Sequence, residues 1–365
     1  MRLAIIAPLV APIREPQRGG SQAFICDLAR GLIDRGAEVA LYAAAGSELP
    51  GVPVVDVGVD SGTLSASLFR ASGGGGGDSA AVESAFAAVY SAVREEESYD
   101  VIHNHAFDPP AISLASGLEA PVVHTVHLPP SAAVSAALRR AASQASPPTV
   151  ATVSAFQAAG WREVVPVDAI LPPYVPTARI PWSRAEVSGA LFAGRLSPEK
   201  GAAEAIDIAQ AAGVAIDLYG DSYDADYARD RIDPRRDEAG VSIHAAVPRS
   251  TLWEAMGRAA VVLCPAGWDE PFGMVAAEAQ ACGTPVVAFD RGAIGEVIVD
   301  GVTGFLVRPG EIGSAADAVS TASGLSRAEC RAHATGHLDL ERSLDAHERL
   351  YRHLVGATTG AAVRG

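Results

Sequence analysis

The sequence predicts an α/β protein built from two doubly wound parallel-sheet domains. Three observations support this fold class: short apolar runs alternate with longer helix-like segments, a proline-rich stretch interrupts the alternation once, and the same alternation then resumes. The length of 365 residues is enough for two domains of ordinary size. Each half is therefore expected to form its own sheet.

Six short apolar runs occur in the first half, and continuous runs of this kind are typical of strands buried on both faces. The runs are "RLAIIA", "EVALYA", "VPVVDVG", "DVIHNH", "PVVHTVH" and "TVATVS". The helix after the first run is predicted to begin near Ser21 and to end before Gly36, which acts as a C-cap. Its apolar residues fall on one helical face: Phe24, Leu28, Leu32 and Ile33.

The alternation stops at "LPPYVPTARIPWSR", where four prolines make a stiff, non-helical connector. We predict domains at 1–175 and 176–340, and a segment 341–365 that forms a helix packing back across the hinge, followed by a tail. Ligands of such sheets bind beyond the carboxyl ends of the strands, so we expect one cleft between the domains. The strands of the second domain are predicted in "GALFAG", "VAIDLYG", "VSIHAA", "AAVVLCP", "TPVVAF" and "GFLVRPG".

The composition indicates a soluble globular protein that binds small anions. Apolar residues make up 49% of the chain, charged residues make up 19%, and the formal net charge is -15. This charge has the wrong sign for binding nucleic acid or an anionic membrane surface, so a bound phosphate needs a local group of cations. No apolar run reaches the roughly 18 residues that a membrane-spanning helix needs.

The cysteines and the N-terminal segment favour a cytoplasmic location. Pro8 interrupts the apolar opening "MRLAIIAPLVAPI" and no A-x-A cleavage site follows, so we expect a buried first strand and not a signal peptide. No pattern indicates the oligomeric state. The cysteines form no C-x-x-C pair, which argues against a disulfide framework or a zinc site and suits a reducing compartment: Cys26, Cys264, Cys282 and Cys330.

The first candidate site is "AGRLSPEKG", directly after the predicted strand "GALFAG". Arg195 and Lys200 lie five residues apart across a turn that contains Pro198, and Lys200 is the only lysine of the chain. A guanidinium fork and a mobile ammonium suit a diphosphate, because one binds oxygens bidentately and the other acts as a point charge. The alternative is two solvated surface charges. Their position at a strand end favours the ligand.

The second candidate site is the helix predicted from about Phe272 to Gly283. Its first amides, from Phe272 through Met274 and Val275, can hold an anion, and Gly273 lets the anion approach the backbone. Glu270 and Glu278 lie eight residues apart, about 12 Å along a helix, which fits the hydroxyls at both ends of a nucleotide sugar. Alternatively, Glu270 only stabilises the helix start and Glu278 is solvated. The apolar neighbours of Glu278 predict burial, so it needs polar partners.

The third candidate site is "REPQRGGSQAF", where Gly19 and Gly20 precede the first helix. The pair can contact an anion or a sugar at the helix start, although a plain turn is an equally good explanation. A dinucleotide-binding protein would carry G-x-G-x-x-G directly after the first strand, and that spacing is absent. This argues against an NAD-dependent dehydrogenase.

Four histidines lie in or after predicted strands of the first domain. His103 and His105 are alternate residues of a strand and share one face. Neither they nor His124 belong to a recognised zinc motif, so we expect no metal. His127 directly follows a predicted strand and is the best polar candidate for the expected cleft.

Together these motifs resemble the retaining glycosyltransferases of family 4, which have the GT-B fold of two Rossmann-like domains. The most specific part is the E-x7-E element with the preceding arginine and lysine. Looser motifs occur in the expected order along nearly the whole chain: "GGSQAFICDLARGLIDRGAEVALYA", "YDVIHNHA", "HTVH" and "TVSAFQ". The specific motifs are "GRLSPEKG", "DEPFGMVAAEAQACGTPVVA" and "DGVTGFLV".

The resemblance implies transfer of a sugar from a nucleotide diphosphate donor, with UDP favoured over GDP, to a hydroxyl of a small molecule or glycan. It implies that Arg195 and Lys200 hold the diphosphate without a metal or other cofactor. Glu278 would bind the ribose and Glu270 the transferred sugar. Retention in this family is usually explained by front-face attack, so no protein nucleophile is expected.

The resemblance further places His127 at the donor sugar and Gly20 near the diphosphate and acceptor. Two segments depart from the family pattern: "DRGAIGEVI" replaces a G-G-x-P-E motif, and residues 221–240 form an unusually charged loop that could contact the base. Glycines 73–77 read as a surface loop, either a spacer or a lid over the acceptor. A nucleotide-sugar epimerase and a catalytically idle nucleotide-sugar-binding protein stay open as alternatives.

Overall fold

The computed structural model describes residues 1–59, 79–96, 98–182 and 188–362. The glycine-rich segment 73–77 lies outside these residues. Among them, no helix is long and apolar enough to cross a membrane. The chain forms two compact units: unit 1 comprises Met1–Arg14, Ser21–Pro172 and Ser343–Gly365, and unit 2 comprises Glu15–Gly20 and Pro173–Arg342.

Unit 1 contains a seven-stranded, all-parallel sheet in the order β3-β2-β1-β4-β5-β6-β7. The strand order reverses between β1 and β4, so the switch point of the sheet lies there. Six strands coincide with the six predicted runs, and the two-residue β7 was not predicted. The strands are β1 (Arg2–Ile6), β2 (Glu38–Ala43), β3 (Val54–Asp56), β4 (Val101–Asn104), β5 (Val122–Val126), β6 (Thr149–Thr152) and β7 (Ala169–Ile170).

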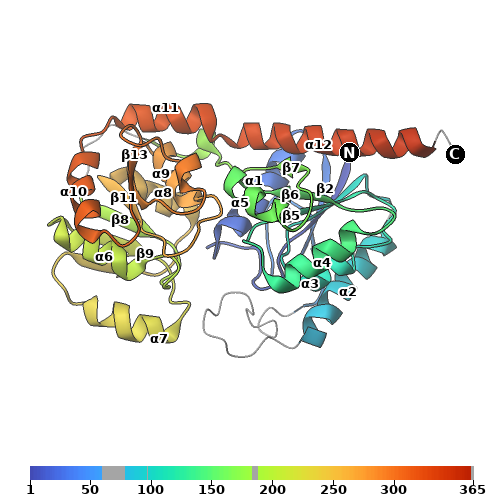
Figure 1. Cartoon of the computed structure of the whole chain (residues 1–365), viewed down its shortest axis with the longest axis horizontal. Coiled ribbons are helices and arrows are strands. Elements are labelled where there is room, and N and C mark those ends of the chain that lie inside the picture. Colours follow the sequence, from blue (N-terminus) through green and yellow to red (C-terminus); the bar gives the residue numbers. More distant parts are fainter. Residues whose placement is uncertain (60–78, 97, 183–187, 363–365) are drawn as a thin grey trace. The chain divides into compact units, whose positions relative to one another are not determined.

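The helices of unit 1 cover both faces of its sheet. The predicted first helix is confirmed as α1, which buries Phe24, Leu28 and Leu32 and is followed by Gly36 at a φ of 88°. Helices α2 and α3 cover one face, while α1 and α12 lie on the other (Figure 1). The helices are α1 (Gly20–Asp34), α2 (Ser79–Glu95), α3 (Pro109–Ser113), α4 (Ala132–Ala142), α5 (Ala155–Arg162) and α12 (Leu340–Ala362).

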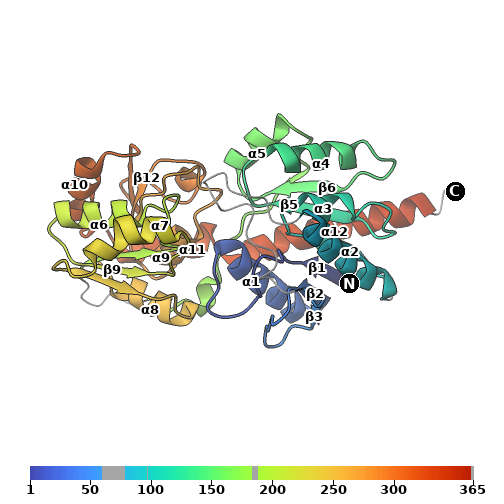
Figure 2. The same cartoon turned by 90° about the horizontal axis from the view of Figure 1, so that it is seen from below.

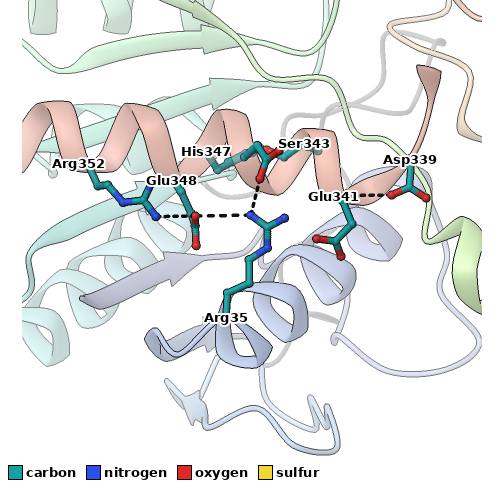
Figure 3. A network of polar contacts seen from close by, with 8 residues as sticks. Arg35, Asp339, Glu341, Ser343, His347, Glu348 and Arg352 are labelled. Atoms are coloured by element: carbon teal, nitrogen blue, oxygen red, sulfur yellow. Dashed lines mark hydrogen bonds and ion pairs between the residues drawn. The ribbon is translucent and has the colours of Figure 1, made fainter. Parts of the chain in front are cut away.

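Helix α12 is attached to unit 1 from Ser343 onward. Figure 3 shows Arg35, which directly follows α1, reaching two carboxylates of α12: Asp345 at 2.8 Å and Glu348 at 3.5 Å. Gly31 allows the close packing, since a Cβ there would lie 2.6 Å from a methyl carbon of Leu344. The C-terminal helix is thus an integral layer of unit 1.

Unit 2 contains a six-stranded sheet in the order β10-β9-β8-β11-β12-β13, again all parallel. The strand order reverses between β8 and β11, so these two strands flank the switch point. All six strands coincide with predicted runs. They are β8 (Ala190–Ala193), β9 (Ile216–Tyr219), β10 (Val241–His244), β11 (Val261–Cys264), β12 (Val286–Phe289) and β13 (Gly304–Val307).

The helices of unit 2 also cover both faces. Helices α6 and α10 share one apolar core with the sheet, while α8 and α9 pack on the opposite face (Figure 2). The helices are α6 (Ala202–Ala211), α7 (Ala225–Tyr227), α8 (Arg249–Arg258), α9 (Met274–Ala281), α10 (Ile312–Ala322) and α11 (Arg327–His337), with shorter helical turns η1 (Thr177–Arg179), η2 (Ala228–Ile232), η3 (Asp233–Arg235) and η4 (Ile294–Glu296).

The expectation that residues 221–240 form a loop is wrong over residues 225–235, where α7, η2 and η3 follow one another. Asp224 begins this helical segment by accepting a hydrogen bond from the amide of Tyr227 at 2.9 Å. The hydroxyl of Tyr227 accepts from the amide of Ala203 at 2.9 Å, and Ile232 is fully buried. Three buried residues among many charges, Tyr227, Ala228 and Ile232, therefore hold the segment against α6.

Candidate functional site

The two loops that follow β8 and β11 meet at the switch point of unit 2. Gly201 has a φ of 74°, and a Cβ there would lie 2.0 Å from the carbonyl oxygen of Pro265, so only glycine fits. The amide of Gly267 donates to the carbonyl of Glu199 at 3.0 Å. This backbone contact brings Lys200, from the first loop, next to Glu270, from the second.

Lys200 and Glu270 form an ion pair of 2.8 Å between Nζ and Oε2, with side chains 24% and 17% exposed. Oε2 also accepts from Nε1 of Trp268 at 2.9 Å, and Nζ lies 4.9 Å from the centre of the Trp268 ring. These bonds fix one oxygen of Glu270 and leave Oε1 for a ligand. Trp268 was not singled out from the sequence.

The loop after β12 supports Glu270 from behind. The backbone of Gly292 pairs with that of Glu270, and the amide of Ala293 donates to the carbonyl of Glu270 at 2.8 Å. Gly292 has a φ of 68°, and a Cβ there would lie 2.3 Å from the amide nitrogen of Glu270. The segment "DRGAIGEVI", which departs from the family pattern, therefore has a defined structural task here.

Arg195 also lies after β8, with its side chain 14% exposed. Its Nη2 is 3.2 Å from Oε1 of Glu199, and its guanidinium lies 5.1 Å from the centre of the Tyr223 ring. Tyr223 belongs to the charged segment before α7. Both cations predicted from the sequence are thus held by a carboxylate and an aromatic ring.

Helix α9 begins at Met274, two residues later than predicted, with Gly273 as its N-cap at a φ of 103°. Glycine is needed at this cap, since a Cβ would lie 2.6 Å from Cδ1 of Ile294. A Cβ on Gly20 would lie 3.1 Å from Sδ of Met274, so the glycine loop contacts the start of α9. At this helix start Phe272 is buried and Val275 is half-buried. A Cβ on Gly19 would have no neighbour within 4 Å, so Gly19 is not brought against α9 as Gly20 is.

Glu278 is buried, as its apolar neighbours predicted, and its partner is Arg249. Nε and Nη2 of Arg249 donate to the same oxygen, Oε1, at 2.9 and 2.6 Å, and the side chains are 10% and 6% exposed. Arg249 begins α8, and its guanidinium lies 4.9 Å from the centre of the Trp253 ring. The sequence predicted that Glu278 needs a partner, but "VPRSTLWEAM" gives no sign that α8 packs on α9.

Cys264 ends β11 beside the Lys200–Glu270 pair. Burial, with a smaller contribution from the Glu270 carboxylate, raises the pKa of this thiol to about 12. The group therefore stays a neutral thiol at physiological pH and is a poor nucleophile. None of the four cysteines is part of a disulfide bond.

His127 lies in unit 1, directly after β5. It is 7% exposed, and burial lowers its pKa to about 4, so it is neutral at pH 7. Its Nε2 is 2.9 Å from Nδ1 of His105, which follows β4. His103 and His105 share one face as predicted, with ring centroids 4.0 Å apart. Among the described residues no group of three or more potential ligands is arranged to hold a metal ion.

Two Rossmann-like units with all-parallel sheets are the architecture of the GT-B glycosyltransferases. AviGT4, a glycosyltransferase involved in avilamycin A biosynthesis, has this fold with a TM-score of 0.71 and 23% identity, over 97% of this chain and 98% of its own. HepE of Anabaena, solved in complex with UDP and glucose, has a TM-score of 0.73 and 21% identity, over 96% and 99%. The fold is therefore GT-B.

The sequence comparisons identify the family. Residues 18–179 match the profile described as Glycosyltransferase Family 4, and residues 185–332 match Glycosyl transferases group 1. A D-inositol 3-phosphate glycosyltransferase of Mycobacterium tuberculosis (strain ATCC 25618 / H37Rv) is 30% identical over 97% of this chain and 84% of the relative. The chain belongs to family 4 of the glycosyltransferases.

Proposed function

We propose that the protein transfers a sugar from a nucleoside diphosphate sugar, with retention at the anomeric carbon, to a hydroxyl of a small molecule or glycan. The observation that carries the proposal is the Lys200–Glu270 ion pair of 2.8 Å, at the carboxyl ends of the strands that flank the switch point of unit 2. A cation for the phosphate and a carboxylate for sugar hydroxyls are thereby adjacent.

Each part of the donor has a candidate partner. Lys200 and Arg195 hold the diphosphate together with the first amides of α9. Glu278 accepts hydrogen bonds from the ribose, and Glu270 accepts them from the transferred sugar. His127 of unit 1 contacts the same sugar. In this proposal the cations and the helix start do the work of a divalent metal, so no cofactor is required.

The chemical step follows from these roles. The acceptor oxygen attacks the anomeric carbon from the face that the diphosphate leaves, the carbon–oxygen bond to the phosphate breaks, and the acceptor proton passes to a phosphate oxygen. Negative charge develops on the leaving group, where Lys200 and Arg195 stabilise it. Cys264 stays protonated, which agrees with a mechanism without a protein nucleophile.

Two comparisons support the donor class. The mycobacterial relative is named as a glycosyltransferase, and HepE was solved with UDP and glucose. We therefore propose UDP as the preferred nucleotide, ahead of GDP, and a hexose as the transferred sugar. The four thiols form no disulfide and suit a reducing cytoplasm, where we place the reaction.

Incubating the purified protein with UDP-sugars and GDP-sugars, with and without acceptor extracts, tests the proposal. We expect nucleotide release that depends on acceptor, persists in EDTA, and gives a product with the anomeric configuration of the donor by NMR. An epimerised donor without acceptor would indicate an epimerase instead. Binding of the nucleotide sugar without turnover in any extract would indicate a binding protein.

A further inference from the structure

Four buried histidines of unit 1 form a connected group that the proposed reaction uses only at one end. The successive ring centroids of His127, His105, His103 and His347 lie 5.2, 4.0 and 5.6 Å apart. We name these four residues the histidine stack. It runs from the end of β5 past β4 to α12, and all four side chains are buried.

The bond between His105 and His127 leaves one ring nitrogen for a ligand. Nε2 of His127 is 2.9 Å from Nδ1 of His105, so Nδ1 of His127 is the remaining polar atom of that ring. Both rings are neutral at pH 7, because burial lowers the pKa of His127 to about 4 and that of His105 well below its ordinary value. A neutral imidazole carries a single N–H.

Two proton arrangements satisfy the His105–His127 bond. If Nδ1–H of His105 donates, His127 carries its own proton on Nδ1 and offers a hydrogen-bond donor to a ligand. If Nε2–H of His127 donates, its Nδ1 is a bare acceptor, and His105 must carry its proton on Nε2. Whether His127 offers a donor or an acceptor to the ligand therefore depends on whether Nε2 of His105 carries a proton.

That far nitrogen decides between the two arrangements. Nε2 of His105 is buried and has no hydrogen-bond partner. A buried N–H without an acceptor is rarer in proteins than a buried acceptor without a donor. The first arrangement is therefore favoured, with a proton on Nδ1 of His105 and a proton on Nδ1 of His127.

The remainder of the stack fixes the His105 ring. His103 packs on it and is itself held at both nitrogens, by the hydroxyl of Tyr351 at 2.5 Å and by Oγ1 of Thr125 at 2.7 Å. His347 donates Nδ1–H to the carbonyl of Ser343 at 2.7 Å, which fixes its tautomer because a carbonyl only accepts. Tyr351 and His347 both belong to α12, so this helix supports the ring from behind.

We propose that His105 is a positioning residue that makes His127 a neutral Nδ1–H donor toward the transferred sugar, and so excludes His127 as a general base. This inference rests on the proposed function, in which His127 contacts that sugar. Helix α12 takes part indirectly, by holding His103 against His105. The role of His127 is then to bind a hydroxyl oxygen, while the leaving phosphate takes the acceptor proton.

The ring protons can be observed without any turnover. In protein with 15N-labelled histidine, long-range 1H–15N NMR distinguishes the two tautomers, and His105→Asn and His127→Asn spectra assign the signals. We expect His127 and His105 to be protonated on Nδ1. A proton on Nε2 of His127 would overturn the inference. This result is obtained even if the protein transfers no sugar, in which case the proposed function fails separately.

Two pairs of variants test the consequence for the reaction. Asparagine at position 127 keeps an N–H donor near the place of Nδ1, whereas aspartate offers only acceptors, so His127→Asn should retain more kcat/KM than His127→Asp. A higher kcat/KM in His127→Asp than in His127→Asn would show that His127 acts as a general base. His105→Leu should lower kcat/KM by about 10- to 100-fold, by analogy with groups that orient metal-binding histidines. It should leave the affinity for UDP, which lacks the sugar, unchanged.

His124 provides the matched control. It is on β5 and 1% exposed, but it bonds the side chain of Asn104 at 2.9 Å and not His127. His124→Leu therefore removes an equally buried imidazole from the same sheet. Equal losses of kcat/KM in His124→Leu and His105→Leu would show that only the packing of a buried side chain matters. The same conclusion would follow if His105→Asn were no more active than His105→Leu.

Discussion

The ion pair between Arg249 and Glu278 allows the stability and the binding role of one carboxylate to be separated. The side chains are 10% and 6% exposed, so both charges are largely removed from water. Removing one partner of such a pair leaves an uncompensated buried charge and costs about 3–5 kcal/mol of unfolding free energy. We therefore expect Arg249→Met and Glu278→Leu each to destabilise unit 2 by about this amount.

Replacing both partners should restore stability. Apolar residues of similar volume in place of a buried pair are often neutral, or stabilising by about 1–4 kcal/mol. The double variant Arg249→Met/Glu278→Leu should accordingly be close to wild type in urea unfolding. Trp253 is a local fluorescent reporter, since its ring lies 4.9 Å from the Arg249 guanidinium. If the double variant is as unstable as the sum of the single variants, the reasoning about uncompensated charge is wrong.

Nucleotide binding should follow a different pattern. Nε and Nη2 of Arg249 both bond Oε1 of Glu278, so we propose that Oε2 accepts the hydrogen bonds of the ribose. A hydrogen bond to a charged group is worth about 1.5–3 kcal/mol, or roughly 10- to 150-fold in Kd. Calorimetry should show that the affinity for UDP falls by this factor in the stable double variant and in Glu278→Gln.

A nucleotide without ribose hydroxyls isolates that contribution. 2′,3′-Dideoxyuridine diphosphate should bind the wild type more weakly than UDP by about the same factor, and should bind Glu278→Gln no more weakly than UDP does. Equal affinity of the wild type for the two nucleotides would refute the ribose assignment, whatever the stability data show.

Three further changes have defined outcomes. Lys200→Ala should lower turnover by about 10²–10³-fold with unit 2 still folded, because it removes charge stabilisation from the leaving group, and near-wild-type nucleotide release would exclude that role. Gly292→Ala should destabilise the protein by more than about 1 kcal/mol in urea unfolding, and it should reduce activity in kinetic assays by displacing Glu270. Gly295→Ala is the control, since a Cβ there would have no neighbour nearer than 3.7 Å, and it should change neither the stability nor the activity. Burial lowers the pKa of His347 to about 4 from about 6.5 in the unfolded chain, so its neutral form contributes stability above pH 6.5 that is lost as the pH falls toward 4. His347→Phe should flatten the pH dependence of the unfolding free energy in that window by up to about 1.4 kcal/mol per pH unit, and an unchanged slope would contradict the assignment.

Most of the fold could be predicted because most strands are short, largely apolar runs that alternate with longer helix-like segments. The two-residue β7 is too short to produce such a run, and it was missed for that reason. The segment 225–235 was mistaken for a loop because its charges outnumber its three buried residues, Tyr227, Ala228 and Ile232. A periodic pattern of apolar residues can be recognised only in an element that buries much apolar surface. Both β7 and the segment 225–235 bury little.

The candidate site could be predicted where its residues follow strand ends, and not where they contact residues distant in the sequence. Lys200 and Glu270 could be chosen as candidates because each closely follows a recognisable strand, and the structure shows that they form an ion pair. Arg249, Trp268 and the contact of His105 were missed, because their partners Glu278, Lys200 and His127 are distant in the sequence and only folding of each unit brings them together. The apolar neighbours of Glu278 predict that its carboxylate is buried and needs a polar partner, but they do not predict which residue is that partner.

In the proposed function, Lys200 changes partners when the donor binds, and this explains why the residue is a lysine. Its side chain and that of Glu270 are still 24% and 17% exposed, so the two negative charges of a diphosphate would compete with the single carboxylate for Nζ. The flexible stem of lysine permits that exchange, whereas an arginine would bind the carboxylate through a planar fork and resist it. Glu270 stays in place afterwards, because Trp268 holds Oε2 at 2.9 Å and the loop at Gly292 holds its backbone. In the proposed function, the carboxylate that Lys200 releases then accepts hydrogen bonds from the hydroxyls of the sugar that the diphosphate carries.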